Sequence, residues 1–146
     1  MIREIQGNLF DAPRGSALVQ CISADGKMPR GISVQFLKRF PSPKWKKLQL
    51  GSAVPIETKG TLIYNLITKE RFFEKPKAKV LAECLQGVKD QAQAKGIYFI
   101  SMPLLGCGLD RLNYSRDLKP ILLEIFSGTE YCVMVLVQDV ISFRYV

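Results

Sequence analysis

Short apolar runs alternate with amphipathic stretches along the chain, and this pattern predicts an α/β protein. Four of the runs are continuously apolar, which is typical of strands buried on both faces of a parallel sheet. These four strand candidates cover residues 17–23, 62–68, 97–102 and 131–137. Two weaker candidates, residues 2–5 and 53–57, are expected at the edges of the sheet. The sequence therefore predicts six strands.

The stretches between the strands have helical spacing. Apolar residues recur every three or four positions from Val80 to Ala92, and Gly96 follows as the expected stop. Gly87 lies inside this period and costs a helix about 1 kcal/mol relative to Ala. Residues 32–40 and 118–126 predict two shorter helices.

Strands that alternate with helices form βαβ units, and right-handed crossovers then place helices on both faces of a mainly parallel sheet. We expect one domain over residues 1–146, a three-layer α/β/α architecture around a mixed, mainly parallel six-stranded sheet. The composition agrees, because 47% hydrophobic and 23% charged residues are close to the globular average.

The chain contains no histidine, and this excludes several classes of site. Ser-His-Asp and Cys-His nucleophiles, HExxH metalloproteases and Cys/His zinc fingers all need imidazole. The four cysteines, Cys21, Cys84, Cys107 and Cys132, show no CxxC spacing. We therefore expect buried, reduced thiols, no metal site and no cofactor. With no signal-peptide or transmembrane pattern, the expected location is an intracellular reducing compartment, the cytoplasm or a nucleus.

Basic residues exceed acidic ones by 21 to 13, a formal net charge of +8. Many of them fall in two stretches, residues 27–59 and 69–79. Such an excess favours a polyanionic ligand, either a nucleic acid or a phosphorylated nucleotide. It is also an ordinary charge for the solubility of a small domain, so charge alone leaves both interpretations open.

The residues that follow the strands are the candidates for chemistry, because ligands of open α/β sheets bind beyond the carboxyl ends of parallel strands. Gly106-Cys107-Gly108 allows close backbone approach to a phosphate, as do Gly26 and Gly31 ahead of a helix. Two such segments at one edge suggest a diphosphate. A glycine pair also serves a plain strand-to-helix turn, which is the alternative explanation.

Three side chains near this edge have possible catalytic roles. Lys69 ends an apolar strand and, if partly desolvated, would offer a neutral amine as a nucleophile. Asp110 is a candidate general acid or base, and Cys107 lacks an imidazole to activate it. The alternatives are a solvated lysine, a carboxylate at a helix start and a small packing residue.

The order of motifs resembles the macrodomain family over nearly the whole chain. These motifs are Gly7-Asn8-Leu9-Phe10, Gln20-Cys21-Ile22-Ser23-Ala24-Asp25, Gly31-Ile32-Ser33-Val34, Tyr64-Asn65-Leu66-Ile67-Thr68-Lys69 and the run from Ser101 to Leu112. The chain is most similar to the branch of terminal ADP-ribose protein glycohydrolases. A lysine after LIT and an aspartate inside GCGLDRL mark that branch, and here they are Lys69 and Asp110.

The resemblance implies an ADP-ribose site and a metal-independent hydrolase. Lys69 would attack the anomeric carbon of the distal ribose and displace a glutamyl or aspartyl carboxylate, and Asp110 would assist release. O-acyl-ADP-ribose is a further implied substrate. The implied ligand-binding residues are Asn8, Leu9, Ser23, Gly31, Ile32, Ser33, Thr68, Pro103, Gly106, Cys107, Gly108 and Leu109.

Two positions depart from the family pattern. The family usually has an acidic residue where this chain has Asn8, so a charge-assisted bond to adenine becomes a neutral one. Pro29 stands in a loop that is normally rich in glycine, and it removes one N–H that could face a phosphate. Arg30 offers a side-chain contact in its place.

Three other functions remain open at this stage. An ADP-ribose-1''-phosphate phosphatase would use the same pocket, and a non-catalytic ADP-ribose reader would need Lys69 only for structure. Nucleic-acid binding through the basic surface lacks an RNP-like aromatic motif, and it could coexist with hydrolysis if ADP-ribosylated nucleic acid is the substrate. The expected partners are ADP-ribose and mono-ADP-ribosylated protein, with no membrane, and the expected state is a monomer.

Overall fold

The computed structural model describes residues 1–28, 32–40, 48–107 and 112–138. The strands are β1 (Ile2–Gln6), β2 (Ala17–Ser23), β3 (Ala53–Thr58), β4 (Thr61–Lys69), β5 (Phe99–Met102) and β6 (Cys132–Val137). The helices are α1 (Ile32–Arg39), α2 (Ala78–Ala94) and α3 (Lys119–Phe126), with a 3-10 turn, η1 (Leu9–Asp11), and a π-helical turn, η2 (Tyr114–Leu118).

The strands form one sheet in the order β1-β6-β5-β2-β4-β3. All neighbouring pairs are parallel except β3 and β4, which are antiparallel. The sheet is therefore mixed and mainly parallel, as the sequence predicts. The two weak strand candidates do lie at the edges, as β1 and β3.

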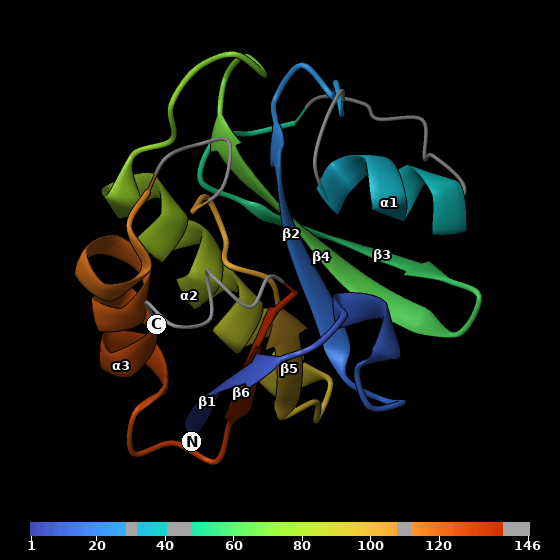
Figure 1. Ribbon diagram of the computed structural model, residues 1–146, viewed down its shortest axis with the longest axis vertical. Helices are drawn as coiled ribbons and strands as arrows, with labels where there is room; N and C mark the ends of the chain where they lie inside the picture. Colours follow the sequence, from blue (N-terminus) through green and yellow to red (C-terminus); the bar gives the residue numbers. More distant parts are fainter. Residues whose placement is uncertain (29–31, 41–47, 108–111, 139–146) are drawn as a thin grey trace.

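Helices cover both faces of this sheet (Figure 1). One apolar cluster joins the sheet to α2 and α3, and its largest buried members include Tyr64, Leu85 and Phe126. A smaller cluster on the other face joins Leu9, Phe36 of α1 and Ile63. The predicted three-layer α/β/α fold is confirmed, and its two cores lie on opposite faces of the strands.

The structure differs from the sequence prediction at several boundaries. Strand β5 begins at Phe99 rather than at residue 97, because the Ile97 N–H is bonded to Ala92 O at the end of α2. Helix α2 runs through Gly87 and ends at Ala94, before Gly96. The two irregular turns, η1 and η2, were not predicted. Residues 41–47, which follow α1 and include Pro41 and Pro43, lie outside the described residues.

All four cysteines are free, but only Cys84 is buried. Cys21, Cys107 and Cys132 are half-buried, so fewer thiols are fully buried than the sequence predicts. Cys21 and Cys107 nevertheless pack against the larger apolar cluster. Within the described ranges, no helix is both long and apolar enough to cross a membrane.

Candidate active site

The parallel strands β2, β4 and β5 end at one edge of the sheet, and this strand-end rim is formed by Ser23, Lys69 and Met102. The chain leaves β2 toward β4 on one side and returns from β4 to β5 on the other side of β2. Helix α1 covers one face and α2 the other (Figure 1). A reversal of strand order of this kind is where open α/β sheets bind ligands.

Lys69 is the last residue of β4 and is half-buried. It is paired with Ser23 of β2, after a register shift between Ile22 and Ser23. Ala24 donates its N–H to Lys69 O at 2.8 Å, which joins the two exits from the sheet. The structure therefore brings two of the predicted site residues, Ser23 and Lys69, side by side.

Asp25 holds together the segments that follow β2 and β4. Its carboxylate accepts hydrogen bonds from Phe72 N at 3.0 Å, from Lys27 N at 3.1 Å and from Ser23 Oγ. Its own N–H donates to Glu70 O at 3.1 Å. These contacts form a clamp around the segment that begins at Lys69.

The hydrogen bonds of this clamp stabilise the negative charge on the Asp25 carboxylate. Burial alone would raise the pKa of Asp25, but the hydrogen bonds from Ser23, Lys27 and Phe72 outweigh it and lower the pKa below the usual value of 3.8. Asp25 is not among the site residues predicted from the sequence. The sequence does contain one signal for it: an aspartate in a turn directly after a strand often accepts a hydrogen bond from the backbone N–H two residues later, as Asp25 does from Lys27.

Thr68 is a predicted ligand contact that lies next to Lys69. Its side chain is 2% exposed, and its Oγ1 has no hydrogen-bond partner in the described structure. Three other buried polar atoms share this property, on Gln20, Tyr64 and Ser101. Gln20 and Tyr64 lie in the middle of their strands, whereas Ser101, like Thr68, is the penultimate residue of its strand. A buried hydroxyl without a protein partner at a strand end is consistent with a ligand or water there.

Backbone hydrogen bonds hold the described residues on either side of the glycine segment after β5. Leu112 donates its N–H to Gly106 O at 2.7 Å, and Cys107 donates to Leu104 O at 3.0 Å. Gly106 has φ of 70°, and a Cβ at this position would lie 2.7 Å from Leu112 Cδ1. Glycine is required here by backbone conformation and packing, whether or not a phosphate binds.

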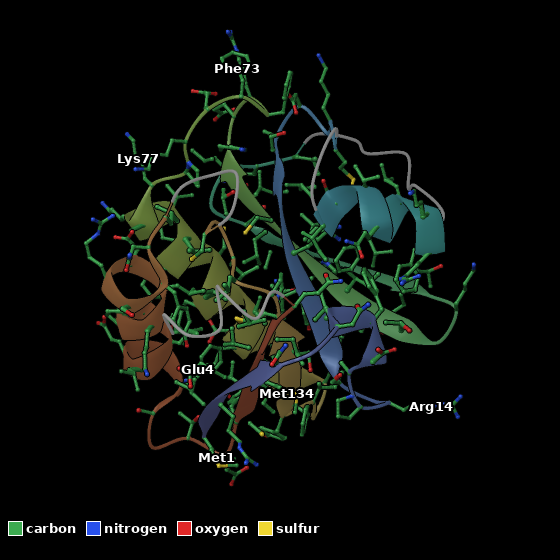
Figure 2. All side chains as sticks on the ribbon, viewed as in Figure 1. Met1, Glu4, Arg14, Phe73, Lys77 and Met134 are labelled. Carbon is green, nitrogen blue, oxygen red and sulfur yellow. The ribbon has the colours of Figure 1, made fainter. Side chains whose placement is uncertain are left out.

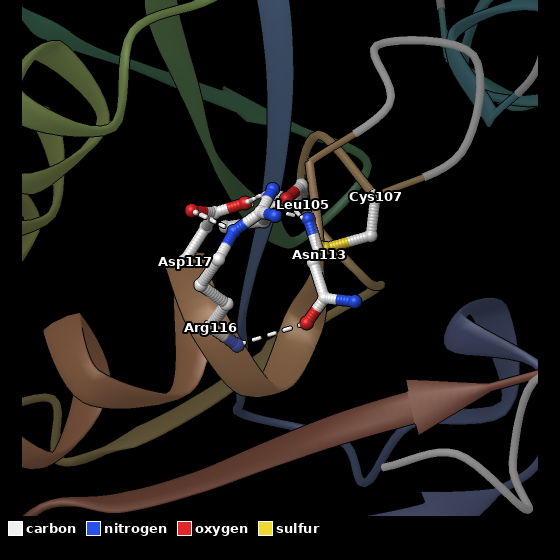
Figure 3. Close-up of polar contacts among 5 residues, drawn as sticks. All are labelled: Leu105, Cys107, Asn113, Arg116 and Asp117. Atoms are coloured by element: carbon white, nitrogen blue, oxygen red, sulfur yellow. Dashed lines mark hydrogen bonds and ion pairs between the residues drawn. The ribbon is translucent and has the colours of Figure 1, made fainter.

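A capped turn follows the glycine segment (Figure 3). Asn113 Oδ1 accepts from Arg116 N at 2.9 Å, and the Asp117 carboxylate accepts from Asn113 N at 2.7 Å. Arg116 also pairs with Asp117 at 3.0 Å. The hydrogen bond from Arg116 is the largest cause that lowers the pKa of Asp117, and the Asn113 N–H adds to it. The start of η2 is thereby fixed beside Cys107.

Cys107 has the properties of a packing residue. Burial raises the pKa of its thiol to about 12, and the charge on Asp117 adds to the effect. Its Sγ donates to Leu105 O at 3.4 Å (Figure 3). A thiol that is protonated at neutral pH is a poor nucleophile.

The predicted adenine contacts lie after β1. Asn8 is the N-cap of η1, and its Oδ1 accepts from Phe10 N at 3.0 Å. The oxygen that we expected to face adenine is therefore already used by the backbone, although a carbonyl oxygen has a second lone pair. Leu9 is 3% exposed and packs in the cluster under α1.

The remaining predicted site residues fall into two groups. Ser33 is buried at the start of α1, while Ile32 and Pro103 are half-buried. Gly31, Gly108, Leu109 and Asp110 lie outside the described residues, so the position of Asp110 relative to Lys69 stays a prediction. Across the described part of the chain, no group of three His, Cys, Asp or Glu residues could hold a metal ion.

Comparison with known proteins gives relatives over most of the chain. No family model matches. The ADP-ribose glycohydrolase OARD1 of Bos taurus is 35% identical over 137 residues, 92% of this chain and 90% of the relative. A DNA ADP-ribosyl glycohydrolase of Thermus aquaticus is 27% identical over 148 residues, 91% of this chain and 41% of that relative. The solved macrodomain of Thermus aquaticus DarG is 25% identical, with a TM-score of 0.80 over 95% of this chain and 98% of that chain.

Proposed function

The chain belongs to the macrodomain family, in the branch of terminal ADP-ribose protein glycohydrolases, and from this we propose the reaction that it catalyses. It is an ADP-ribosyl glycohydrolase. Its substrate is mono-ADP-ribose held by an ester on a glutamyl or aspartyl side chain of a protein. O-acyl-ADP-ribose, which has a related ester, is a second substrate of the same site.

Lys69 is the nucleophile of this proposal. Its neutral Nζ attacks the anomeric carbon of the distal ribose, a C–N bond forms, and the bond from that carbon to the acyl oxygen breaks. The carboxylate leaves with the electron pair. A carboxylate is a good leaving group, so the step proceeds without imidazole, and lysine amines are established covalent catalysts.

Asp110 completes the proposed cycle. Water adds at the anomeric carbon while the C–N bond breaks, so the products are ADP-ribose and free Lys69, and Asp110 assists the proton transfers. If this is its role, Asp110→Ala accumulates a lysine-linked ADP-ribose adduct, which intact-mass spectrometry detects. A folded Asp110→Ala protein that is inactive and carries no adduct would count against the two-step route.

The ligand-binding part of the proposal uses the strand-end rim. Gly106, Cys107, Gly108 and Leu109 hold the diphosphate and distal ribose. Thr68, Ser23 and Pro103 supply further ligand contacts, and so do Gly31, Ile32 and Ser33. Asn8 and Leu9 contact adenine. We also propose that the chain acts as a monomer in a reducing compartment, since its cysteines are free and the exposed large apolar side chains of the described residues are scattered.

The observation that carries this proposal is the position of Lys69. It ends a buried strand at the reversal of strand order, beside Ser23 and the unpartnered Oγ1 of Thr68. The direct test compares two substrates with one enzyme preparation, a glutamate-linked ADP-ribose ester and ADP-ribose-1''-phosphate. The proposal predicts faster turnover of the ester. Faster release of phosphate would favour the phosphatase, and binding without turnover of either would favour a reader.

A further inference from the structure

The turn that directly follows Lys69 carries an exposed aromatic side chain among cations. Phe73 is 64% exposed, more than any other aromatic residue in the described part of the chain. It projects from the end of the molecule where β2 and β4 finish (Figure 2). A single exposed ring is common on protein surfaces, so its surroundings decide whether it has a role.

Phe73 is presented by a fixed turn. Glu74 N donates to Arg71 O at 3.1 Å, and Arg71 N donates to Glu74 Oε1 at 2.7 Å. Phe72 N is held by the Asp25 carboxylate at 3.0 Å. The Phe72 and Phe73 rings meet edge to face, with centroids 5.5 Å apart. The exposed ring therefore has a defined support from Phe72 on one side.

The same turn is surrounded by positive charge. Lys27 lies 5.3 Å from the centroid of the Phe72 ring, and Arg71, Lys75, Lys77 and Lys79 are all exposed. Three acidic residues belong to these segments, Asp25, Glu70 and Glu74, and the carboxylates of Asp25 and Glu74 accept backbone N–H groups. Lys75 is close enough to Asp117 to help lower the pKa of that carboxyl, so the turn also borders the segment after the glycines.

We propose that this aromatic and basic turn, residues 70–79 with Lys27, binds single-stranded nucleic acid. Phe73 stacks on a base, while Lys75, Lys77 and neighbouring cations contact phosphates. Aromatic rings beside cations are the combination that single-strand binding surfaces use. An acidic peptide would use the cations but would leave the exposed ring without a specific partner. This surface does not depend on Lys69 acting as a nucleophile.

The test measures binding of an unmodified, fluorescein-labelled oligothymidylate of about 15 nucleotides by fluorescence anisotropy. Phe73→Ala is expected to weaken binding roughly five- to a hundredfold, because a stacked base is lost. Phe73→Trp restores it, and Leu123→Ala, a change at an exposed apolar residue on α3, leaves it unchanged. Titration with ADP-ribose should give the same affinity for all four proteins, including wild type, which controls for folding.

Lys77 belongs to the proposed surface, and Lys95, at the other end of the same helix, is its matched control. Lys77 is the N-cap residue of α2 and Lys95 its C-cap residue, about 25 Å away. Lys77→Ala should reduce the slope of log affinity against log salt by about 0.7, and Lys95→Ala should not change it.

Two outcomes would overturn the proposal. One is oligothymidylate binding by Phe73→Ala that equals wild type. The other is displacement of the oligonucleotide by a polyglutamate peptide of equal charge at equal concentration, which would indicate an acidic-peptide surface. The same titration with Lys69→Ala separates this proposal from the catalytic one, since its binding curve should match that of wild type even if the ester chemistry is absent.

Discussion

At the scale of single residues, Asp25 is a positioning residue for the proposed nucleophile. It does not need to touch the substrate, because its carboxylate and N–H hold Ser23, Glu70 and Phe72 around the exit of β4. Asp25→Ala removes all of the acceptor oxygens of this clamp. We expect the rate of ADP-ribose release to fall about ten- to a hundredfold, since small misplacement of a reacting group has effects of this size.

The affinity for free ADP-ribose should change less than about tenfold in Asp25→Ala, so the loss appears in kcat rather than in KM. Asp25→Asn keeps one acceptor oxygen and should retain more activity, while Asp90→Ala on α2 is the control for a remote carboxylate. Equal losses in kcat and in ADP-ribose affinity would show that Asp25 shapes the binding site instead.

The pH dependence of this clamp follows from the direction of the pKa shift. The pKa of Asp25 in the folded chain lies below its usual value of 3.8, so the clamp stabilises the fold fully above that pH. Its contribution is lost only as the pH falls through the lowered pKa. Between pH 5 and 8 the stability difference between wild type and Asp25→Asn, measured by urea unfolding, should therefore be constant.

At the scale of elements, substitution by alanine should change the free energy of unfolding in opposite directions at two glycines, Gly106 and Gly87. Gly106 has φ of 70°, and its substituent would meet Leu112 at 2.7 Å. Gly106→Ala should lower the free energy of unfolding by about 1–2 kcal/mol, because L residues are strained in this conformation. It should also weaken ADP-ribose binding. Unchanged stability in urea unfolding would contradict this account of the glycine segment.

Gly87 lies inside α2, where a Cβ would lie 3.5 Å from Ala53 Cβ, an ordinary contact distance. Gly87→Ala should raise the free energy of unfolding by about 0.5–1 kcal/mol, because alanine has the higher helix propensity. The same urea unfolding series measures it. Destabilisation by Gly87→Ala would mean that α2 packs against β3 more tightly than these distances indicate.

The elements show which parts of the fold a sequence can predict. Continuous apolar runs located the four central strands, and the helical period located α2 despite Gly87. The start of β5 was missed because residue 97 is apolar but bonded to the end of α2. The turns η1 and η2 were missed because single caps, Asn8 and Asn113, define them rather than a period.

The sequence selected Lys69 as a candidate, and its catalytic role stays a prediction. Its position after an apolar run drew attention to it, the family resemblance implied its role, and the sheet pairs it with Ser23. Asp25 was missed because its importance lies in contacts with Phe72, a residue 47 positions away along the chain. Pairings of this range depend on which strands are neighbours, which the local pattern does not contain.

At the scale of the whole molecule, the strand order explains why the candidate site residues lie together at the strand-end rim. Strand β2 lies between β4 and β5, and all three run parallel, so their carboxyl ends lie at the same edge. The exits place Lys69, the Asp25 clamp and the Phe73 turn in one region, with α1 and α2 on opposite faces. The proposed hydrolysis and the proposed nucleic-acid binding can therefore be tested separately, by substitutions at Lys69 and at Phe73.

The most direct measurement is the rate of ADP-ribose release from a glutamate-linked substrate by wild type and Lys69→Ala. The account predicts that Lys69→Ala abolishes release while its affinity for free ADP-ribose stays within about tenfold of wild type, or about 1.4 kcal/mol. Lys77→Ala is the matched lysine control and should release ADP-ribose at the wild-type rate from a short peptide substrate. Full activity of Lys69→Ala on this ester would contradict the account.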